Sequence, residues 1–313
     1  MPQSAGADYP LVSPYSQSVE RSGWGIRLIA TAKFIYCFWR PHMDRLAHKV
    51  AIVTGSGTRS TNVTGVGMAT AKLFASHGAS VLIVDMNESA ARITEKAIHD
   101  EGGKASIFIG DVAEESVCKE LVKTAVTRYG KLDILMNSVA IGGPGTVTEI
   151  SEDFWDRVLD VDLKSMVFIS KYAVPEMAKG GGGSIINISS VDGMRAAMTR
   201  NIPYAAAKGG MISVTRAMAV HHGRENIRVN CIAPGMLHSS MTEAVDDRKR
   251  EIRRKLAPLG TEGRAEDIAM AATFLASEEA RWITGVLLPV DAGLMAAGPQ
   301  SLLNNILEDY EYK

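Results

Sequence analysis

KVAIVTG at residues 49–55 and SVLIVD at residues 80–85 are the two runs that decide the fold of this chain. Each run is short and continuously apolar, which is typical of a strand buried on both faces of a parallel sheet. The residues between them, 68–77, carry apolar side chains at helical spacing and stop at Gly78. Strand, glycine loop, helix and strand in this order predict a βαβ unit.

The alternation of apolar runs and helical segments continues along the rest of the chain. Further strands are expected at residues 107–110, 132–137, 184–189, 227–233 and 285–290. Further helices are expected at residues 116–129, 154–177 (in one or two pieces), 204–220 and 265–276. Regular alternation predicts the α/β class: one domain with a doubly wound parallel sheet of about seven strands and helices on both faces. Ligands of such sheets bind beyond the carboxyl ends of the strands.

The composition is that of a globular protein without a strong charge bias. The 313 residues are 46% hydrophobic, which is ample for a packed core. A net charge of −1 gives no electrostatic case for nucleic acid as the main partner. The cysteines, Cys37, Cys118 and Cys231, lie far apart without metal-ligand spacing. We therefore expect a reduced, cytoplasmic compartment, no disulfide framework and no metal site.

The first 45 residues differ from the rest and are expected to form an extension outside the domain. Residues 1–22 are rich in Ser, Pro and Gly, which is typical of a disordered segment. Residues 24–39 are aromatic-rich but too short and too charged for a membrane-spanning helix. A flexible extension or a misassigned first exon is the preferred interpretation; an amphipathic helix on a membrane or on the protein's own surface is the alternative. The domain is expected at residues 46–296, followed by a tail at 297–313.

The glycines before the first helix predict a phosphate site. Gly65-Val66-Gly67 opens that helix directly, so its N–H groups and the positive end of its dipole face the ligand side. Asp85 ends the next strand 18 residues after Gly67, where a carboxylate can accept hydrogen bonds from both ribose hydroxyls of an NAD adenosine. A 2′-phosphate would be repelled there, so the pattern favours NAD over NADP. Arg59 argues for NADP, and a plain turn is the other interpretation of Asp85.

A tyrosine and a lysine one helical turn apart predict a proton-transfer site. Tyr204 and Lys208 share a helix face, about 5 to 6 Å apart at Cβ. A fixed cation beside a phenol favours the phenolate and lowers the phenol pKa, so that the group can act as a general acid or base. Pairs with this spacing also arise by accident, and a structural tyrosine beside a solvated lysine would show the same pattern.

Together, the motifs between residues 46 and 293 resemble those of the short-chain dehydrogenase/reductase family. They are Thr54-Gly55 with Gly65-Val66-Gly67, Asp85, Asp111-Val112, LDILMN at 132–137, IINISS at 185–190, Tyr204 with Lys208, Pro234-Gly235 and ITGVLLPVDAG at 283–293. The resemblance implies a single-domain Rossmann fold and an NAD(P)-dependent oxidoreductase that interconverts a secondary alcohol and a ketone. It also implies a homodimer or homotetramer formed through the helices at 154–177 and 204–220.

The same resemblance assigns roles to individual residues. It implies that Tyr204 is the proton donor or acceptor, that Lys208 lowers its pKa and holds the nicotinamide ribose, and that Ser190 hydrogen-bonds the substrate oxygen. The other cofactor contacts that it implies are Gly55, Gly65, Val66, Gly67, Asp85, Asp111, Val112, Asn137, Pro234, Gly235, Leu237 and Ser239. Ser239 takes the place of a usual threonine that binds the carboxamide.

Three departures from the family pattern bear on the site. Nine residues, 56–64, separate the first glycine from the paired glycines where three are usual, and the extra residues either bulge outward or block the pyrophosphate. Asn-Asn-Ala-Gly after the fourth strand is here Asn137-Ser138-Val139-Ala140, which puts a Cβ where glycine backbone would approach the cofactor. Asp162 occupies the position of a catalytic Asn, and its charge is expected to oppose the lowering of the Tyr204 pKa.

The segment at residues 238–260 resembles the substrate lid of the family. Its basic run at 248–255 is expected to be a solvated helix face, with an anionic substrate as the alternative. Pocket candidates by position are Gly143, Asp192, Met194, Met198 and Met236. Because methionines adapt to irregular shapes, they favour an apolar, fairly bulky ketone or secondary alcohol.

Two other functions remain open on the sequence. A dehydratase, isomerase or epimerase could retain Tyr204 and Lys208 without turning over nicotinamide. A catalytically impaired cofactor-binding protein is favoured by the loop insertion, Ala140 and Asp162 together. Retention of Ser190 with the tyrosine and lysine argues against the impaired protein.

Overall fold

The structure, a computed structural model, describes residues 44–306 apart from 59, 61 and 197–199. Every described residue belongs to one unit, Pro41–Lys313. The hypotheses on residues 1–22 and 24–39, on Arg59, on Met198 and on the tail beyond residue 306 therefore concern residues outside the described ones. None of the described helices has the length and apolar character needed to span a lipid bilayer.

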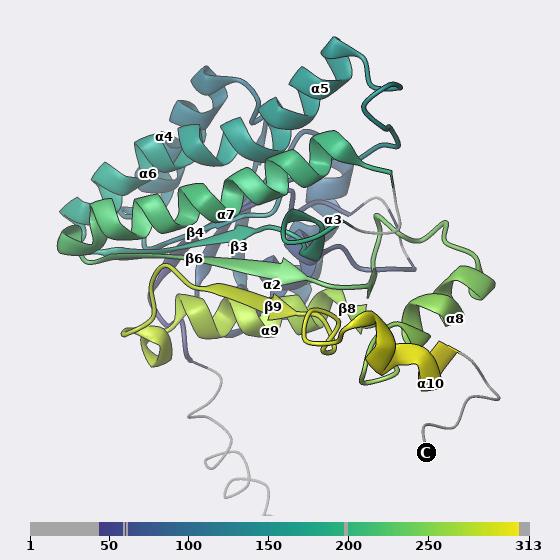
Figure 1. The fold of residues 1–313 in the computed structure, drawn as a ribbon. Coiled ribbons are helices and arrows are strands. Elements are labelled where there is room, and N and C mark those ends of the chain that lie inside the picture. The colour runs from purple at the N-terminus through teal and green to yellow at the C-terminus, as the bar shows by residue number, and fades with distance from the viewer. Residues whose placement is uncertain (1–43, 59, 61, 197–199, 307–313) are drawn as a thin grey trace, which may run out of the picture. The chain divides into compact units, whose positions relative to one another are not determined.

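A seven-stranded parallel sheet forms the centre of the domain (Figure 1). Its strands are β1 (Val50–Thr54), β2 (Ser80–Asp85), β3 (Lys104–Ile109), β4 (Ile134–Asn137), β5 (Gly183–Ile188), β6 (Ile227–Pro234) and β9 (Leu287–Val290). They lie in the order β3-β2-β1-β4-β5-β6-β9, and every neighbouring pair is parallel. The predicted fold class is confirmed. The order reverses between β1 and β4, which is the switch point where such sheets bind ligands.

Helices cover both faces of the sheet (Figure 1). One face carries α2 (Val66–Ser76), α3 (Glu88–Asp100) and α9 (Ala265–Ala276). The other face carries α4 (Glu115–Tyr129), α5 (Glu152–Leu159), α6 (Ser165–Lys179) and α7 (Ile202–His222).

Strand β1 shows why the apolar runs are continuous. Val53 packs in the cluster that includes Phe74 of α2, whereas its neighbour Ile52 packs in the opposite cluster with Leu121 of α4. All four side chains have no exposed surface. Successive residues of a strand point to opposite faces, so a strand covered on both sides needs an apolar residue at every position. Burial of each such side chain contributes about 1.5–3 kcal/mol.

Helix α3 was not expected from the sequence. Its buried face consists of Ala90, Ala91, Thr94 and Ile98, and these mostly small side chains give little apolar periodicity. The helix is nevertheless well specified at its start, because the side chain of Asn87 accepts a hydrogen bond from the Ala90 N–H. Strand β3 likewise begins at Lys104, three residues before the expected start.

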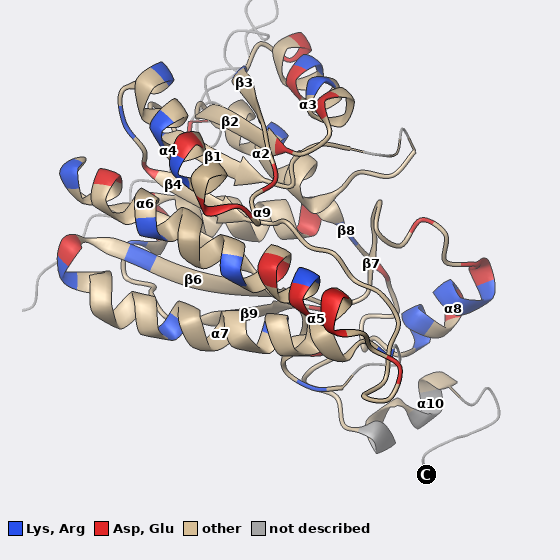
Figure 2. Ribbon diagram, turned by 90° about the horizontal axis from the view of Figure 1, so that it is seen from above, with Lys and Arg blue, Asp and Glu red and all other residues tan. Residues whose placement is uncertain are grey.

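The segment after β6 leaves the sheet and forms the region expected to be the lid. It contains β7 (Leu237–His238), α8 (Asp247–Lys255) and β8 (Gly263–Arg264), and β7 pairs with β8. Figure 2 shows that most of the α8 ribbon is coloured as Lys and Arg, with acidic positions among them. No residue of α8 is fully buried, in line with the solvated helix face that was expected.

Candidate active site

Helix α7 holds Tyr204 and Lys208 on one face at the carboxyl end of the sheet. The Lys208 ammonium lies 5.4 Å from the centroid of the Tyr204 ring. Lys208 is only 1% exposed, and its Nζ donates a hydrogen bond of 3.0 Å to the carbonyl of Ile188 at the end of β5. A solvated lysine, the alternative interpretation of this pair, is therefore wrong. The ammonium is a fixed charge beneath the phenol.

Ser190 joins this pair from the loop after β5. Its hydroxyl accepts a hydrogen bond of 3.1 Å from the Asp192 N–H and is close enough to Tyr204 for its hydrogen bond to lower the phenol pKa. Ser189 supports the end of the strand, because its hydroxyl donates to the Lys208 carbonyl over 2.8 Å. The structure thus brings Ser190, Tyr204 and Lys208 together from two elements.

The pKa of the Tyr204 phenol lies above its ordinary value. Burial of the phenol is the largest influence and raises the pKa, and it outweighs the lowering by Lys208. Asp162 raises the pKa further, as expected from its charge. The prediction that the Tyr204 pKa is lowered overall is therefore wrong. The sequence pattern shows the neighbouring cation, but it does not show how deeply the phenol is buried.

Asp162 lies in a π-helical turn, η2 (Asp160–Lys164), which joins α5 to α6. The carboxylate is 1% exposed; its Oδ1 accepts a hydrogen bond of 2.8 Å from the Ile141 N–H, and its Oδ2 lies 3.4 Å from Lys208 Nζ. That distance makes an ion pair rather than a well-formed hydrogen bond, and Oδ2 has no hydrogen-bond partner among the described residues. Burial raises the Asp162 pKa despite the attraction of Lys208. A π turn at such a position is frequent at functional sites.

The glycine loop leaves the first turn of α2 uncapped by side chains. Gly65 is the N-cap of α2; no side chain caps this helix and no acidic residue lies in its first turn. Its first N–H groups are therefore available to a phosphate. A Cβ on Gly67 would lie 2.1 Å from the Gly55 carbonyl oxygen, so only glycine permits this close packing of loop on strand. The predicted opening of the helix at 65–67 is confirmed.

Asp85 lies at the carboxyl end of β2 next to this loop. Its two oxygens accept hydrogen bonds of 2.9 Å from the N–H groups of Gly57 and Asn87. These bonds fix the carboxylate and leave further lone pairs for the hydroxyl groups of a ribose. The residues present fit a dinucleotide at this place.

The loop insertion is partly folded into the domain and partly directed to the lid. Ser56 and Thr58 are 0% and 3% exposed, and the Ser56 hydroxyl both donates to the Val53 carbonyl and accepts from the Val84 N–H. Further along, the Ser60 hydroxyl donates to Glu243 over 3.0 Å. Ser56 and Thr58 of the insertion are thus packed into the domain, and Ser60 contacts the lid segment.

Three further cofactor candidates, Asp111, Val112 and the last residue of β4, have structural partners of their own. Asp111 is partly buried, but the Ala113 N–H and the Arg157 guanidinium (2.8 Å) together hold its pKa below the usual range. Val112 is buried in the core. Asn137 is 4% exposed and donates to Asn187 over 2.8 Å, so it links β4 to β5.

The cofactor candidates after β6 are packed at the edge of the sheet. A Cβ on Gly235, which follows Pro234 at the end of β6, would lie 2.6 Å from the Asp291 Cα. The Leu237 carbonyl accepts hydrogen bonds of 2.7 Å from Thr242 and from Arg253 of α8. Ser239 is 7% exposed, and its N–H donates to the Thr242 hydroxyl.

The substrate candidates differ in burial and in their neighbours. Asp192 is half-buried, and its charge raises the Tyr204 pKa. Met194 is 37% exposed and Met236 is half-buried. Gly143 packs against the Phe154 ring, since a Cβ there would lie 2.5 Å from its Cζ.

Two polar residues of this region were not predicted. Asn201 is the N-cap residue of α7, three residues before Tyr204, and its Oδ1 is buried without a hydrogen-bond partner among the described residues. Glu262 is buried under the lid, where it pairs with Arg250 and Arg253 over 2.8 Å each. No sequence signal marks that pairing.

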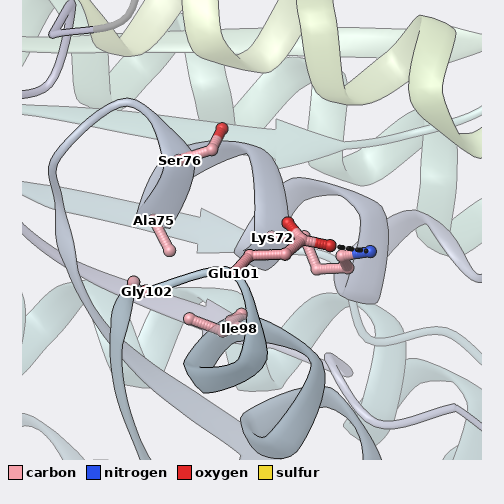
Figure 3. Close-up of a pocket in the computed structure, with 7 residues that line it drawn as sticks. Lys72, Ala75, Ser76, Ile98, Glu101 and Gly102 are labelled. Carbon is pink, nitrogen blue, oxygen red and sulfur yellow. Dashed lines mark ion pairs between the residues drawn. The ribbon is translucent and has the colours of Figure 1, made fainter.

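Two surface hollows lie away from Tyr204. The one in Figure 3 has a volume of about 110 Å³ and lies between α2 and α3, beside the Lys72–Glu101 ion pair of 2.8 Å. It is small for a cofactor, and no proposed site residue lines it. The other, of about 500 Å³, lies between residues 62–64, α8 and the start of α9. No group of His, Cys, Asp and Glu side chains suited to a metal ion occurs in the described part of the chain.

Comparisons with known proteins agree with this geometry. Residues 60–295 match the family model described as enoyl-(acyl carrier protein) reductase. A 3-oxoacyl-[acyl-carrier-protein] reductase of Chlamydia muridarum is 39% identical over 250 residues, which are 80% of this chain and 98% of the relative. A 2,5-dichloro-2,5-cyclohexadiene-1,4-diol dehydrogenase of Sphingobium indicum is 37% identical, covering 80% of this chain and 97% of the relative.

A solved structure extends the likeness to three dimensions. The crystal structure of a short-chain dehydrogenase/reductase from Burkholderia xenovorans matches with a TM-score of 0.78 and 38% sequence identity, over 82% of this chain and 99% of that chain. The order of the strands and the glycine loop lead to the same assignment. So does the clustering of Ser190, Tyr204 and Lys208. The chain belongs to the short-chain dehydrogenase/reductase family of oxidoreductases.

Proposed function

We propose that this protein is an NAD-dependent oxidoreductase that interconverts a secondary alcohol and a ketone. The observation that carries the proposal is the cluster of Ser190, Tyr204 and Lys208, with the lysine buried and fixed beneath the phenol. A phenol that can exchange a proton beside a hydroxyl that can hold an oxygen is suited to a carbinol or carbonyl group. The names of the relatives, which include reductases and a dehydrogenase, support the same reaction class.

Each residue of the cluster has a distinct role in this reaction. Ser190 hydrogen-bonds the substrate oxygen, and Tyr204 takes the hydroxyl proton on oxidation or returns it on reduction. Lys208 stabilises the phenolate through its charge, while Asp162 and the Ile188 carbonyl hold the ammonium in place. The nicotinamide supplies the hydride acceptor or donor when it is bound.

NAD is the proposed cofactor because of Asp85 and the first turn of α2. The N–H groups of Val66 and Gly67 would hold the pyrophosphate, and Asp85 would accept hydrogen bonds from the adenosine ribose. The Asp85 carboxylate would repel the 2′-phosphate of NADP.

Calorimetric titration followed by a turnover assay tests the proposal. We expect NAD to bind, and the reduced-nicotinamide absorbance to change across a panel of cyclic and aliphatic secondary alcohols. Tyr204→Phe should bind NAD normally but lower kcat by at least about 10²-fold, because only the proton transfer is removed. Binding without turnover on the panel would favour a non-redox acid/base reaction, and no binding of either dinucleotide would favour an impaired protein. Unchanged turnover of the phenylalanine variant would refute the role of Tyr204.

Self-association and compartment are further parts of the proposal. Val220 at the end of α7 is 78% exposed and Val167 of α6 is 39% exposed, which suits burial between subunits of a homodimer or homotetramer. Light scattering at several concentrations tests this. Burial raises the pKa of the Cys118 and Cys231 thiols to about 11, so both stay protonated, as suits a reduced, cytoplasmic compartment.

A further inference from the structure

The larger surface hollow, of about 500 Å³, lies between the loop insertion and the lid. It is lined by residues 62–64 at the end of the insertion, by Arg250 and Arg254 of α8, by His238 of β7 and by residues of the segment 261–266. None of the three proposed proton-transfer residues lines it. The hollow has the volume of a small-molecule site and is separate from the site around the phenol.

The part of α8 that lines the hollow carries more positive charge than its partners neutralise. Arg250 and Arg254 are four residues apart and share one face of the helix, where like charges repel. Glu251 pairs with Arg254, but the Glu262 carboxylate is shared between Arg250 and Arg253, at 2.8 Å from each. Burial lowers the pKa of Arg253, and the charge of Arg250 lowers it further. An anion in the hollow would relieve this repulsion.

The two-stranded sheet beside α8 adds a further cation and an imidazole. His238 is the register partner of Arg264 in the parallel pair of β7 and β8, so their side chains lie on the same face. Leu237, the preceding residue, packs in the core cluster, and alternation along the strand turns His238 away from the core. No carboxylate pairs with the Arg264 guanidinium in the described part of the chain. The His238 Nδ1 likewise has no hydrogen-bond partner there.

The remaining wall of the hollow is polar. Glu262 and Glu266 are its acidic residues; Glu262 is already neutralised by two arginines, and Glu266 is exposed, so solvent screens its charge. Asn62, Thr64 and Thr261 bring an amide and two hydroxyl groups. A wall of this composition suits an anionic group on a hydrophilic molecule and does not suit an apolar one.

We propose that this hollow binds a phosphoryl group carried by a small hydrophilic molecule, at a site separate from those of the dinucleotide and of proton transfer. Guanidinium groups that approach from two elements favour a phosphate, because its oxygens accept bidentate hydrogen bonds. The hydroxyl groups of the ligand bond to the amide and hydroxyl side chains of the wall. Since the ligand contacts residues 62–64 and α8 together, its binding holds the lid to the loop insertion. The inference does not depend on the proposed alcohol/ketone reaction.

Calorimetric titration with three matched compounds tests the proposal. We expect glucose 6-phosphate to bind, inorganic phosphate to bind more weakly and glucose not to bind. Arg254→Gln and Arg264→Gln should each raise the Kd of glucose 6-phosphate about fivefold or more, because each removes a charged donor to the phosphate. The control is Arg248→Gln, which removes the same charge from an exposed position of α8 that does not line the hollow. This variant should leave the Kd unchanged.

The same titrations with and without NAD separate this site from the dinucleotide site. Equal Kd values in both conditions support two sites, whereas weaker binding of glucose 6-phosphate in the presence of NAD places it on the pyrophosphate site and overturns the proposal. No binding of either phosphate compound also overturns it, as does an equal loss in Arg248→Gln, which would reflect net charge alone. Because no turnover is measured, a failure of the reaction class leaves the result intact.

Protease cleavage of the lid provides a second readout. Glucose 6-phosphate at a saturating concentration should slow cleavage within residues 241–259 in the wild type, because the ligand bridges α8 and the insertion. It should slow cleavage much less in Arg264→Gln. Unchanged cleavage in the wild type, under conditions where calorimetry shows binding, would place the ligand elsewhere and contradict the assigned site.

Discussion

At the scale of single residues, the site is governed by three ionisable groups with opposing effects. Burial raises the pKa of Tyr204, Lys208 lowers it, and Asp162 raises it again. Since Lys208 and Asp162 are both fully buried, solvent screens their interaction little. The negative charge of Asp162 therefore affects the Tyr204 pKa in two ways. It acts directly on the phenol, and it offsets the positive charge of Lys208.

The Asp162→Asn substitution should move the pH dependence of alcohol oxidation to lower pH. Oxidation needs the phenolate, and removal of the negative charge lowers the Tyr204 pKa, so the rising limb of kcat against pH shifts toward acid. The two profiles should converge below the raised pKa of Asp162, where its carboxyl is already neutral. Asp160→Asn is the control: this residue lies in the same turn, but its side chain is 41% exposed and pairs with Lys164. Superimposable profiles for Asp162→Asn and the wild type would contradict the assigned effect.

The sequence predicted those residues of the site that follow a regular spacing. Tyr204 and Lys208 are a helical turn apart, and Asp85 ends an apolar strand, so local pattern sufficed for both. Asn201 and Glu262 could not be predicted, because their significance depends on what lies beside them after folding. The predicted direction of the Tyr204 pKa shift was wrong for the same reason, since burial is a property of the tertiary structure.

At the scale of elements, the lid is held more firmly than its basic sequence suggested. The Glu262 side chain is 5% exposed; it accepts a hydrogen bond from Arg250 of α8 and forms an ion pair with Arg253, which also donates to the Leu237 carbonyl. Thus α8 is tied to β7 through the Leu237 carbonyl and to the residue before β8 through the Glu262 carboxylate. Six strands of the large sheet were predicted to within two residues because burial on both faces leaves a continuous apolar run, and only β3 begins three residues away from its predicted start. Helix α8 contributes no buried residue and left no such pattern.

Glu262→Gln should loosen the lid without unfolding the domain. The substitution leaves the Arg253 guanidinium, 13% exposed, without its counter-charge, and loss of one partner of a buried pair is strongly unfavourable. We expect protease cleavage within residues 241–259 to become roughly tenfold faster or more, with the midpoint of global unfolding much less affected. Glu251→Gln is the control, because that carboxylate is 50% exposed and pairs with Arg254 at the surface, where such pairs contribute little. Equal cleavage rates for the two variants would show that Glu262 does not anchor the lid.

At the scale of the whole molecule, the cofactor site joins parts that are distant in the chain. The glycine loop contacts the lid through Ser60 and Glu243, and a Cβ on Gly65 would lie 2.9 Å from the Ser240 hydroxyl oxygen. A dinucleotide bound at α2 would therefore contact the sheet edge and the lid segment together. Binding at such a junction should stabilise the native state as a unit, because the ligand has no comparable site on the unfolded chain.

NAD should accordingly raise the thermal unfolding midpoint more than NADP does. At a concentration of 100 times its Kd, a ligand that binds only the native state adds about 2.7 kcal/mol. For a domain of this size, that corresponds to a rise in Tm of about 5–10 °C. NADP at the same concentration should give a smaller rise, because its 2′-phosphate meets the fixed Asp85 carboxylate. Asp85→Ala should narrow the difference, whereas Asp100→Ala at the exposed end of α3 should not. Equal rises in Tm for both dinucleotides in the wild type would mean that Asp85 does not select between them. No rise in Tm with either one would contradict the proposal that the protein binds a dinucleotide.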